Sequence, residues 1–372
     1  MKIGFDAKRA YNNFRGLGNY SRDTIRILSS QIPDNQYFLF TPKVNSDIHF
    51  DTDRNCSVIL PSSRCEKYMS SLWRTFSLTK EAEKRHLDVY HGLSHELPYG
   101  IEKTGIRTVV TVHDLIFIKF PQLYPFIDRN LYKIKYLHSC RIADKVVAIS
   151  EQTRRDLIEL VGIPEQKITV IYQGCNPIYR QQVPVALKEE IRKKYKLPQQ
   201  YVFNVGALEE RKNQQLILEA MLLCHTDFHL VIAGRETDYA RQLKAFIQQH
   251  HLESRVTLLP NVSFSDLPAL YQSASLFVYP SLFEGFGIPV LEALQSGLPV
   301  IASTGSCLEE SGGEGSLYVS PKNAEELAEK ISFVLENESQ RNKMLEKNKS
   351  HLDLFTDETI AQKLKEVYFS SI

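Results

Sequence analysis

The sequence predicts an α/β protein of two doubly wound domains, each with a parallel sheet between helices, facing each other across a cleft. Three observations lead to this prediction. At 372 residues, the chain is long enough for about two domains with separate cores. Short runs rich in β-branched residues alternate with helical patterns almost throughout, as is typical of strands buried on both faces of a parallel sheet. One polar stretch with three prolines, residues 173–200, interrupts this alternation.

The first half begins with a strand at residues 2–7, a loop that contains GLGNYS, and a helix from about Ser21. A helical segment at residues 66–86 should place Trp73 and Phe76 on its apolar side and several Lys and Arg on the other. The other expected strands of this half are residues 37–41, 57–61, 89–93, 107–115, 145–150 and 168–174. These elements define an N-terminal domain, residues 1–178.

The second half repeats the pattern after a linker at residues 179–200. Its expected strands are residues 201–206, 228–234, 256–260, 276–281 and 298–303, separated by helices. Together they define a C-terminal domain, residues 201–355, followed by a last helix at residues 356–372.

Composition restricts the class of protein. Hydrophobic residues make up 43% and charged residues 24%, as in ordinary soluble proteins, and the net charge of +1 gives no general sign of nucleic-acid binding. Through residue 170 the chain has 25 Lys and Arg against 19 Asp and Glu, whereas the remainder has 20 against 25. A basic first half and an acidic second half could orient the protein on an anionic surface, or the charges could simply lie on ordinary solvated faces.

The cysteines and the apolar runs predict a cytoplasmic protein. The six cysteines are scattered without a CxxC pair, and a strand that begins at Lys2 leaves no room for a signal peptide, so we expect a reducing compartment. No apolar run approaches the ~18–20 residues of a membrane-spanning helix. Any membrane contact is therefore expected to be peripheral.

The most informative motif is FEGFGIPVLEALQSGLPVIAS, residues 283–303. If Glu284 and Glu292 lay on one helix, their side chains would point in directions roughly 80° apart around its axis, so they would not share a helical face. However, Pro289 is expected at the first helical position, which leaves Glu284 in the preceding loop and Glu292 near the first turn. Both carboxylates could then face one small ligand, and the amides at the helix start favour anions or hydroxyl oxygens.

A second motif, ALEERKN, follows the strand that ends at Gly206. It places Arg211 and Lys212 directly before a helix that should begin near Asn213. Two cations beside a helix N-terminus predict a diphosphate site, since Arg offers a planar fork and Lys a point charge. The alternative is a solvated, charged turn.

Two N-terminal features are also candidates for ligand contact. GLGNYS lacks the third glycine of a dinucleotide loop, and no acidic residue ends the second strand, so a nicotinamide site is disfavoured. Gly16 and Gly18 could still border a ligand, or form a plain tight turn. His113 ends a strand beside Asp114, a position suited either to ligand contact or to a structural hydrogen bond; His91 and His95 are placed similarly but less specifically.

Other patterns are given no chemistry. The pair Asp51 and Asp53 resembles a cation-binding Asp-x-Asp, but it lies in a polar run, so a surface turn is expected. His225 and His229 flank a turn and predict no metal site. The sequence also lacks the motifs of zinc proteases, P-loop proteins and serine hydrolases. Phosphate and polyol recognition in a cleft is the chemistry that is left.

These motifs resemble glycosyltransferase family 4, whose members are retaining enzymes with the GT-B fold of two Rossmann-like domains. FEGFGIPVLEALQSGLPVIAS resembles the Glu-x7-Glu signature of the family and NVGALEERKN its phosphate loop. GLGNYS, VTVHDL and KVVAISEQTRRDL resemble N-terminal landmarks of the family, so the similarity spans nearly the whole chain in order. One departure is SCLEES, residues 306–311, where Glu309 replaces a proline; that loop is assigned no role.

The resemblance implies roles for individual residues. Glu292 would bind the ribose of a nucleotide sugar, Glu284 the hydroxyls of the transferred sugar, and Arg211 with Lys212 the departing diphosphate. The other implied donor contacts are Gly16, Gly18, Gly206, Gly234, Val262 by its backbone, Phe286 and Gly287 by their amides, and His113. The residues expected to act in catalysis are His113, Arg211, Lys212 and Glu284. No cofactor or metal is implied, and the last helix would cross back to the N-terminal domain.

The resemblance also suggests the substrates. GLGNYS with HDLIFIKFPQLYP is most similar to the mannosyltransferase branch, which favours GDP-mannose as donor, with UDP-hexoses as the alternative. The expected acceptor is a glycan or lipid-linked saccharide of a surface polysaccharide at the inner membrane face. Basic helices at residues 66–86 and 129–141 suit peripheral docking. A sugar-nucleotide epimerase of the same fold and a non-catalytic subunit are the alternatives from other classes.

Overall fold

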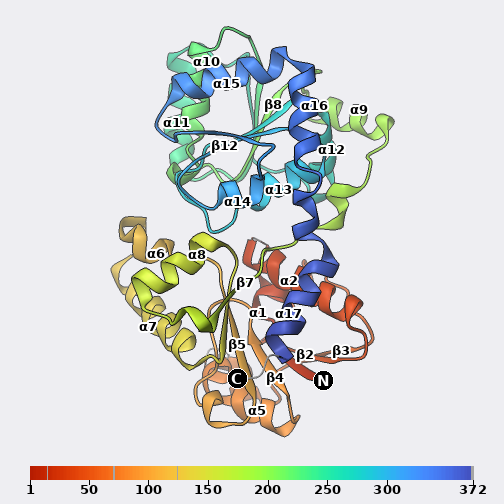
Figure 1. Ribbon diagram of the computed structural model, residues 1–372, viewed down its shortest axis with the longest axis vertical. Coiled ribbons are helices and arrows are strands. Elements are labelled where there is room, and N and C mark those ends of the chain that lie inside the picture. Colours follow the sequence, from red (N-terminus) through yellow and green to blue (C-terminus); the bar gives the residue numbers. More distant parts are fainter. Residues whose placement is uncertain (15, 70–71, 124, 370–372) are drawn as a thin grey trace. The chain divides into compact units, whose positions relative to one another are not determined.

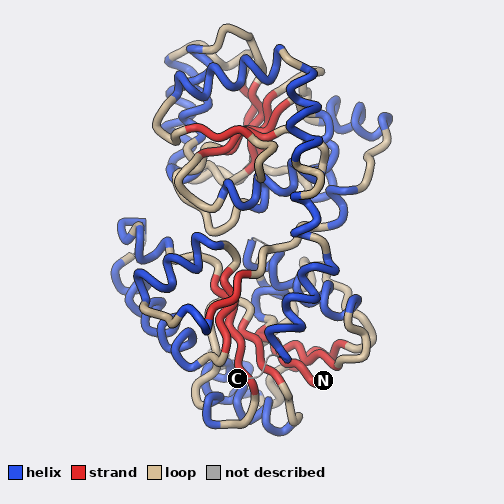
Figure 2. The backbone as a smooth tube through the Cα atoms, in the orientation of Figure 1, coloured by secondary structure: helices blue, strands red, loops and turns tan. Residues whose placement is uncertain are grey.

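In the computed structural model, which describes residues 1–14, 16–69, 72–123 and 125–369, the chain forms two compact units (Figure 1). The first unit contains Met1–Gly174 and Leu354–Ile372, and the second contains Cys175–Asp353. Each unit has one parallel sheet with helices around it, drawn red and blue in Figure 2. The predicted α/β class with two doubly wound sheets is therefore confirmed.

The sheet of the first unit has seven strands in the order β3-β2-β1-β4-β5-β6-β7, all parallel. The strands are β1 (Lys2–Asp6), β2 (Gln36–Phe40), β3 (Cys56–Ile59), β4 (Val89–Gly92), β5 (Arg107–Val112), β6 (Lys145–Ala148) and β7 (Ile168–Val170). The helices are α1 (Lys8–Asn12), α2 (Gly16–Gln31), α3 (Arg64–Tyr68), α5 (Leu78–Lys84), α6 (Ile116–Lys119), α7 (Phe126–Ile142), α8 (Glu151–Asp156) and α17 (Asp357–Phe369). The apolar runs of β4, β5 and β6 form the core with Trp73 and the inner sides of α5 and α7.

Two predictions for this unit were wrong in detail. GLGNYS is not a loop, because α2 already begins at Gly16. A methyl group on Gly18 would lie 1.9 Å from the carbonyl oxygen of Asn13, so Gly18 allows α2 to pack closely on the end of α1. Trp73 is buried as predicted, but Phe76 is 58% exposed and faces away from the core.

The helix α17 packs on α2 within the first unit. Arg26 and Asp357 form an ion pair at 2.6 Å. Near the other end of α17, the hydroxyl of Tyr368 lies 2.7 Å from His91 Nδ1 in the buried interior. The last helix was expected at residues 356–372, of which 370–372 lie outside the described residues.

The sheet of the second unit has the order β10-β9-β8-β11-β12-β13, also all parallel. Its strands are β8 (Val202–Val205), β9 (Leu230–Ala233), β10 (Val256–Leu259), β11 (Leu276–Tyr279), β12 (Val300–Ser303) and β13 (Leu317–Val319), the last of which was not predicted. Its helices are α9 (Val185–Lys194), α10 (Gln214–Leu223), α11 (Tyr239–Gln249), α12 (Leu267–Ser273), α13 (Ile288–Gln295), α14 (Leu308–Gly312), α15 (Ala324–Glu336) and α16 (Glu338–Lys347).

The stretch expected to be a linker, residues 179–200, belongs to the second unit. It contains α9, which packs on α12. Lys194 Nζ and the hydroxyl of Tyr195 both donate to Asp266 Oδ2, at 2.6 and 2.7 Å. A charged surface helix and its prolines look like linker composition in the sequence, but these bonds hold the segment against the domain.

Each sheet has a point where the strand order reverses, between β1 and β4 in the first unit and between β8 and β11 in the second. Loops that leave the carboxyl ends of neighbouring strands diverge there and form the usual ligand site of doubly wound sheets. In the second unit, the loop after β8 carries Arg211 and Lys212, and the loop after β11 carries Glu284.

Candidate functional site

The loop after β8 presents its cations through a short helical turn. Gly206 directly follows β8, and Glu210–Lys212 form one turn of 3-10 helix. Asn213 then takes a left-handed conformation, with φ of 57°, and α10 begins at the next residue, as the sequence predicted. Asn tolerates this backbone better than most residues, so the chain can reverse direction directly after the two cations.

Asn213 also ties this loop to two others. Its side-chain amide donates to the carbonyl oxygen of Pro280 at 3.0 Å and to that of Pro321 at 2.8 Å. In addition, the backbone N–H of Leu282 donates to the carbonyl oxygen of Arg211 at 2.8 Å. The loop that bears the cations and the loop that bears Glu284 are therefore fixed relative to each other by direct hydrogen bonds.

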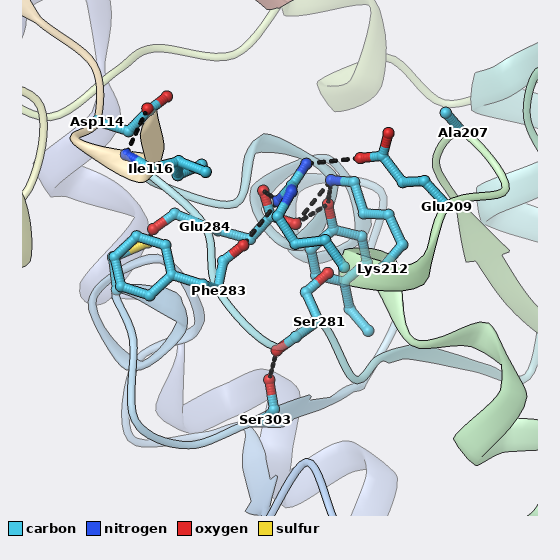
Figure 3. Close-up of polar contacts among 12 residues, drawn as sticks. Asp114, Ile116, Ala207, Glu209, Lys212, Ser281, Phe283, Glu284 and Ser303 are labelled. Atoms are coloured by element: carbon cyan, nitrogen blue, oxygen red, sulfur yellow. Dashed lines mark hydrogen bonds and ion pairs between the residues drawn. The ribbon is translucent and has the colours of Figure 1, made fainter. Parts of the chain in front are cut away.

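Both predicted cations contact the predicted carboxylate. Lys212 Nζ lies 2.7 Å from Glu284 Oε1, and Arg211 Nη1 lies 2.8 Å from Glu284 Oε2 (Figure 3). Arg211 also donates to the carbonyl oxygen of Phe283 at 2.6 Å and to Glu209 Oε1 at 2.7 Å. We call Arg211, Lys212 and Glu284 the ion cluster.

The ion cluster determines the charge state of its members. Burial of Glu284 opposes its ionisation, but the adjacent charges of Lys212 and Arg211 outweigh that effect and lower the pKa of the carboxyl to about 2. Burial likewise acts against the charge of Arg211, yet Glu284 raises the pKa of the guanidinium. The ionised forms of Glu284 and Arg211 are thus favoured at neutral pH. The carboxylate accepts bonds on both oxygens, so it is neutralised from two sides.

Tyr279, the last residue of β11, is a member of this site that the sequence analysis did not identify. Its buried hydroxyl donates to Glu284 Oε1 at 3.2 Å and accepts a hydrogen bond from Lys212 Nζ. Its ring lies under the ammonium group, with Nζ 5.0 Å from the ring centroid. The available signal was a tyrosine at the carboxyl end of a strand, just before the loop of the Glu-x7-Glu motif.

Two of the predicted donor-binding glycines, Gly206 and Gly234, lie in closely packed places. A methyl group on Gly234 would lie 1.8 Å from the carbonyl oxygen of Gly206. Gly206 has a φ of 155°, and a methyl group there would contact the aliphatic stem of Lys212 at 3.5 Å. Gly234 is therefore required for the packing of β9 against the loop after β8, whether or not a nucleotide also approaches it.

Replacing Gly234 with alanine should destabilise the second unit by about 3 kcal/mol, because the new methyl group meets a backbone oxygen that cannot move alone. Gly105→Ala is the matched control, since a methyl group there has open space. Differential scanning calorimetry of both variants measures the effect. Equal transition temperatures for the two variants would contradict the packing role of Gly234.

The helix α13 begins one residue earlier than predicted. Gly287, with φ of 96°, is its N-cap, and Ile288 precedes Pro289 in the first turn. Phe286 is buried in the loop. Glu292 accepts a hydrogen bond from the hydroxyl of Tyr271 at 2.8 Å. The predicted arrangement of one glutamate in the loop and one on the helix is therefore present in the structure.

The remaining candidate positions lie outside the ion cluster. Val262 follows β10 and is half-buried. Gly16, Gly18 and His113 belong to the first unit. Gly16 is the first residue of α2, and a methyl group there would meet no atom within 4 Å. The structure does not identify ligand contacts for these positions, so their implied roles stay predictions.

His113 is buried and bonded within its own unit. Its Nε2 donates to the carbonyl oxygen of Leu93 at 2.9 Å, and Gln173 Nε2 lies 3.5 Å from Nδ1. Burial lowers the pKa of His113 to about 4, despite the hydrogen bond to Leu93. The imidazole is therefore neutral at pH 7. These contacts fit one of the two roles that the sequence left open for His113, namely a structural hydrogen bond.

The Asp-x-Asp pattern, to which the sequence analysis assigned no chemistry, lies on the surface. Asp51 and Asp53 are exposed, and Asp53 accepts a hydrogen bond from Ser29. Among the described residues, no group of His, Cys, Asp and Glu side chains is arranged to hold a metal ion. In the same described part of the chain, no helix is long and apolar enough to cross a bilayer.

Comparison with known families places both halves of the chain in one class. Residues 15–178 match the family described as Glycosyltransferase Family 4, and residues 188–351 match Glycosyl transferases group 1. Among curated proteins, the chain is 31% identical over 261 residues to O-antigen chain mannosyltransferase B of Escherichia coli, which covers 68% of this chain and 66% of the relative. It is 30% identical over 276 residues to O-antigen chain mannosyltransferase RfbU of Salmonella typhimurium, with 71% and 72% covered.

Solved structures show the same fold at lower identity. Alr3699/HepE of Anabaena, solved with UDP and glucose, superposes with a TM-score of 0.76 at 18% identity, and both chains are covered completely. A glycosyltransferase of Rickettsia africae superposes with a TM-score of 0.75 at 20% identity, covering 99% of this chain and 97% of the other.

Proposed function

The chain belongs to glycosyltransferase family 4 and is thus a glycosyltransferase, and on this premise we propose that it transfers mannose from GDP-mannose, with retention, in surface polysaccharide biosynthesis. The acceptor is a glycan or lipid-linked saccharide, and the reaction takes place in the cytoplasm at the inner face of the membrane. The two bacterial relatives are both O-antigen chain mannosyltransferases by name, which supports mannose as the transferred sugar.

The observation that carries this proposal is the ion cluster at the strand-order reversal of the second unit. Arg211 and Lys212 supply two positive charges beside the N-terminus of α10, which suits a diphosphate. Their charge is balanced by Glu284, so a diphosphate has to compete with this carboxylate for the same donors. Donor binding is therefore expected to free Glu284 to accept hydrogen bonds from sugar hydroxyls.

The proposed step breaks the bond between C1 of the sugar and the diphosphate oxygen, and it forms a bond between C1 and the acceptor oxygen on the same face. The acceptor proton passes to the departing phosphate oxygen. Arg211 and Lys212 stabilise the charge that develops on the diphosphate, so we assign no step to a metal. Glu284 is an unsuitable nucleophile, because its pKa of about 2 and two cationic partners reduce its basicity.

The other implied contacts complete the proposal. Glu292 binds the ribose, Phe286 and Gly287 the sugar, Val262 the base, and Gly206 with Gly234 border the nucleotide. The roles implied for Gly16, Gly18 and His113 belong to the same hypothesis, in which a neutral His113 acts as a hydrogen-bonding group.

The donor is tested by thermal unfolding with GDP-mannose, UDP-glucose and ADP-glucose. At 100 times its dissociation constant, the preferred donor should stabilise the protein by about 2.7 kcal/mol. Stronger stabilisation by UDP-glucose would indicate a UDP-hexose as the donor instead of GDP-mannose. UDP is also the nucleotide bound to the solved structural relative. Stabilisation by none of the three would contradict a nucleotide-sugar site.

The reaction class is tested by incubating the enzyme with donor and acceptor glycan in EDTA. The proposal predicts transfer with an axial product linkage, seen by NMR, and no effect of the chelator. Incubation with the donor alone should leave its sugar configuration unchanged. Isomerised donor without acceptor would instead indicate an epimerase.

A further inference from the structure

A cavity of about 400 Å³ lies in the second unit, at the amino-terminal edge of its sheet. Leu335 of α15 and Arg341 of α16 line one part of it. Its volume falls within the ~300–1,000 Å³ of small-molecule sites in proteins. Four more lining residues directly precede the strands β8, β9, β10 and β11, namely Tyr201, His229, Arg255 and Ser275. We call this space the edge cavity.

The edge cavity is distinct from the ion cluster. The ion cluster lies on loops at the carboxyl ends of β8 and β11, whereas the edge cavity lies at the opposite ends of the same strands. Each of these strands has four residues and is therefore ~13 Å long. At least that length of buried, packed strand separates the two places, so a ligand in the edge cavity would leave the ion cluster accessible.

Arg255 brings an unsatisfied donor to the edge cavity. Its Nε donates to the carbonyl oxygen of Phe228 over a long distance of 3.4 Å. Its Nη2 is buried and lies 3.1 Å from Asp227 Oδ1, yet it makes no hydrogen bond within the described part of the chain. The Asp227 side chain is 92% exposed, so water weakens this ion pair. Because a buried donor without an acceptor is costly, this position favours a ligand with acceptor oxygens.

Arg341 supplies a second positive charge to the same cavity. Its Nη1 donates to the carbonyl oxygens of Val334 and Leu335, at 2.7 and 2.8 Å, which fixes the side chain at the end of α15. Asp227 is the only acidic residue among the described residues that line the cavity. The edge cavity is therefore positively charged on balance.

We propose that the edge cavity binds a phosphate monoester of a ring compound, either a sugar phosphate or an aryl phosphate. The three terminal phosphate oxygens accept hydrogen bonds from both guanidinium groups, whose planar forks suit phosphate. A carboxylate fits less well, because one guanidinium fork already occupies both of its oxygens. The ring packs on an apolar wall and meets hydrogen-bonding groups beside it. The wall is formed by Tyr201, Phe228 and Leu335, and the polar groups by Gln200, Thr226 and Ser275.

The test titrates the full-length protein with glucose 6-phosphate and with phenyl phosphate in a calorimeter. Inorganic phosphate, methyl glucoside and benzyl alcohol serve as partial ligands. The ester with the matching ring should bind at one site per chain, ~10-fold or more tighter than any partial ligand, since only the ester fills both parts of the cavity. Glucose 6-phosphate as the tighter ester identifies a sugar phosphate site, and phenyl phosphate as the tighter ester identifies an aryl phosphate site.

Variants of the two arginines locate the binding. Arg255→Ala and Arg341→Ala should each weaken binding of the tighter ester by ~10-fold or more, because each removes charge-assisted hydrogen bonds. Arg241→Ala is the matched control, since its side chain is 83% exposed on the same unit and pairs with Asp238. An unchanged thermal transition without ligand shows that a variant is folded. Arg255→Gln and Arg341→Gln, which keep an amide donor, replace an alanine variant that fails this check.

A phosphate monoester also suits the cations of the ion cluster, so Arg211→Ala is the decisive comparison. This variant should bind the ester as tightly as the unchanged protein does. Weak binding by Arg211→Ala together with full binding by Arg255→Ala would overturn the proposal, as would equal binding of inorganic phosphate or binding of neither ester. Thermal stabilisation by nucleotide sugars tests the donor site separately. Ester binding without it would reject the proposed function and leave the edge cavity as a binding site.

Discussion

Arg211→Ala should lower kcat by ~100-fold or more, because in the proposed mechanism the guanidinium stabilises the negative charge that develops on the departing diphosphate. The ion cluster makes this effect specific: Arg211 is fixed by Glu284, Phe283 and Glu209, so its charge is in place before the donor binds. Arg241→Ala is the matched control, since Arg241 is a well-exposed arginine of the same unit that pairs with Asp238. Steady-state kinetics of both variants with the preferred donor measure the difference.

Glu284→Gln should separate donor binding from turnover. The amide keeps the size of the side chain but removes the charge that competes with a diphosphate for Arg211 and Lys212. We therefore expect the nucleoside diphosphate to bind more tightly. We also expect kcat to fall by ~100-fold, because in the proposed mechanism the carboxylate supports positive charge on the sugar and a neutral amide does not. Isothermal titration with GDP and UDP measures the first effect. Glu236→Gln, which alters a surface pair with Lys244, is the control.

Near-normal kcat in both Arg211→Ala and Glu284→Gln would refute the assigned catalytic roles. If kcat falls in Glu284→Gln but the diphosphate binds more weakly, the carboxylate holds the cations in place rather than competing with the ligand. Tyr279→Phe then gives a further check, because it removes one hydrogen bond to each of Lys212 and Glu284 without changing a charge.

Acidification from pH 7 to pH 5 should destabilise the first unit through its buried histidines. Burial lowers the pKa of His91 to about 3 and that of His113 to about 4. Below pH 6.5 the unfolded chain binds protons at both positions, whereas the folded chain does not, so stability is lost as the pH falls. At pH 5 the loss is about 2 kcal/mol for each histidine.

His95 and Asp23, two further described residues of this unit, also contribute to the change between pH 7 and pH 5. Burial lowers the pKa of His95 well below its usual value, which adds to the loss. Burial also raises the pKa of Asp23 to about 6, although Arg26 acts against it. The folded state therefore takes up this proton more readily, which offsets about 1 kcal/mol of the loss at pH 5. The expected net destabilisation is about 3 kcal/mol or more.

Denaturant unfolding at both pH values measures this change through Trp73, which lies in the core of the first unit and reports on that unit. In His113→Gln, the pH-dependent part should shrink by about 2 kcal/mol. His49→Gln is the control, because His49 is exposed. A pH dependence that is identical in the two variants would show that burial of His113 does not limit its protonation.

Much of the fold could be predicted because it depends on local patterns. The apolar runs of β1, β4, β5, β8 and β11 lie within one or a few residues of their predicted bounds, since strands buried on both faces need no partner information to be recognised. Gly287 with Pro289, and Asn213 after Lys212, marked helix starts by backbone preference alone. The short strand β13 was not predicted, because Ser316 and Ser320 limit its apolar run to three residues, whereas the three residues of β7 belong to the longer run ITVIY.

The sequence could not show which side of a segment a neighbouring element covers. The helical spacing of Trp73 and Phe76 is compatible with one apolar side, and only the packing of residues distant in the chain shows that Trp73 enters the core and Phe76 does not. The same holds for residues 179–200, whose bonds to Asp266 no local pattern reveals.

By itself, the sequence determined the order of strands and helices and the residue types at the ends of β8 and β11, because backbone preference and hydrophobic periodicity are local. Only the tertiary structure decided that Arg211 and Lys212 pair with Glu284 and that Tyr279 joins them. These side chains are far apart in the chain, and their pairing depends on strand order, burial and the low polarity of their surroundings, which strengthens the attraction between the charges.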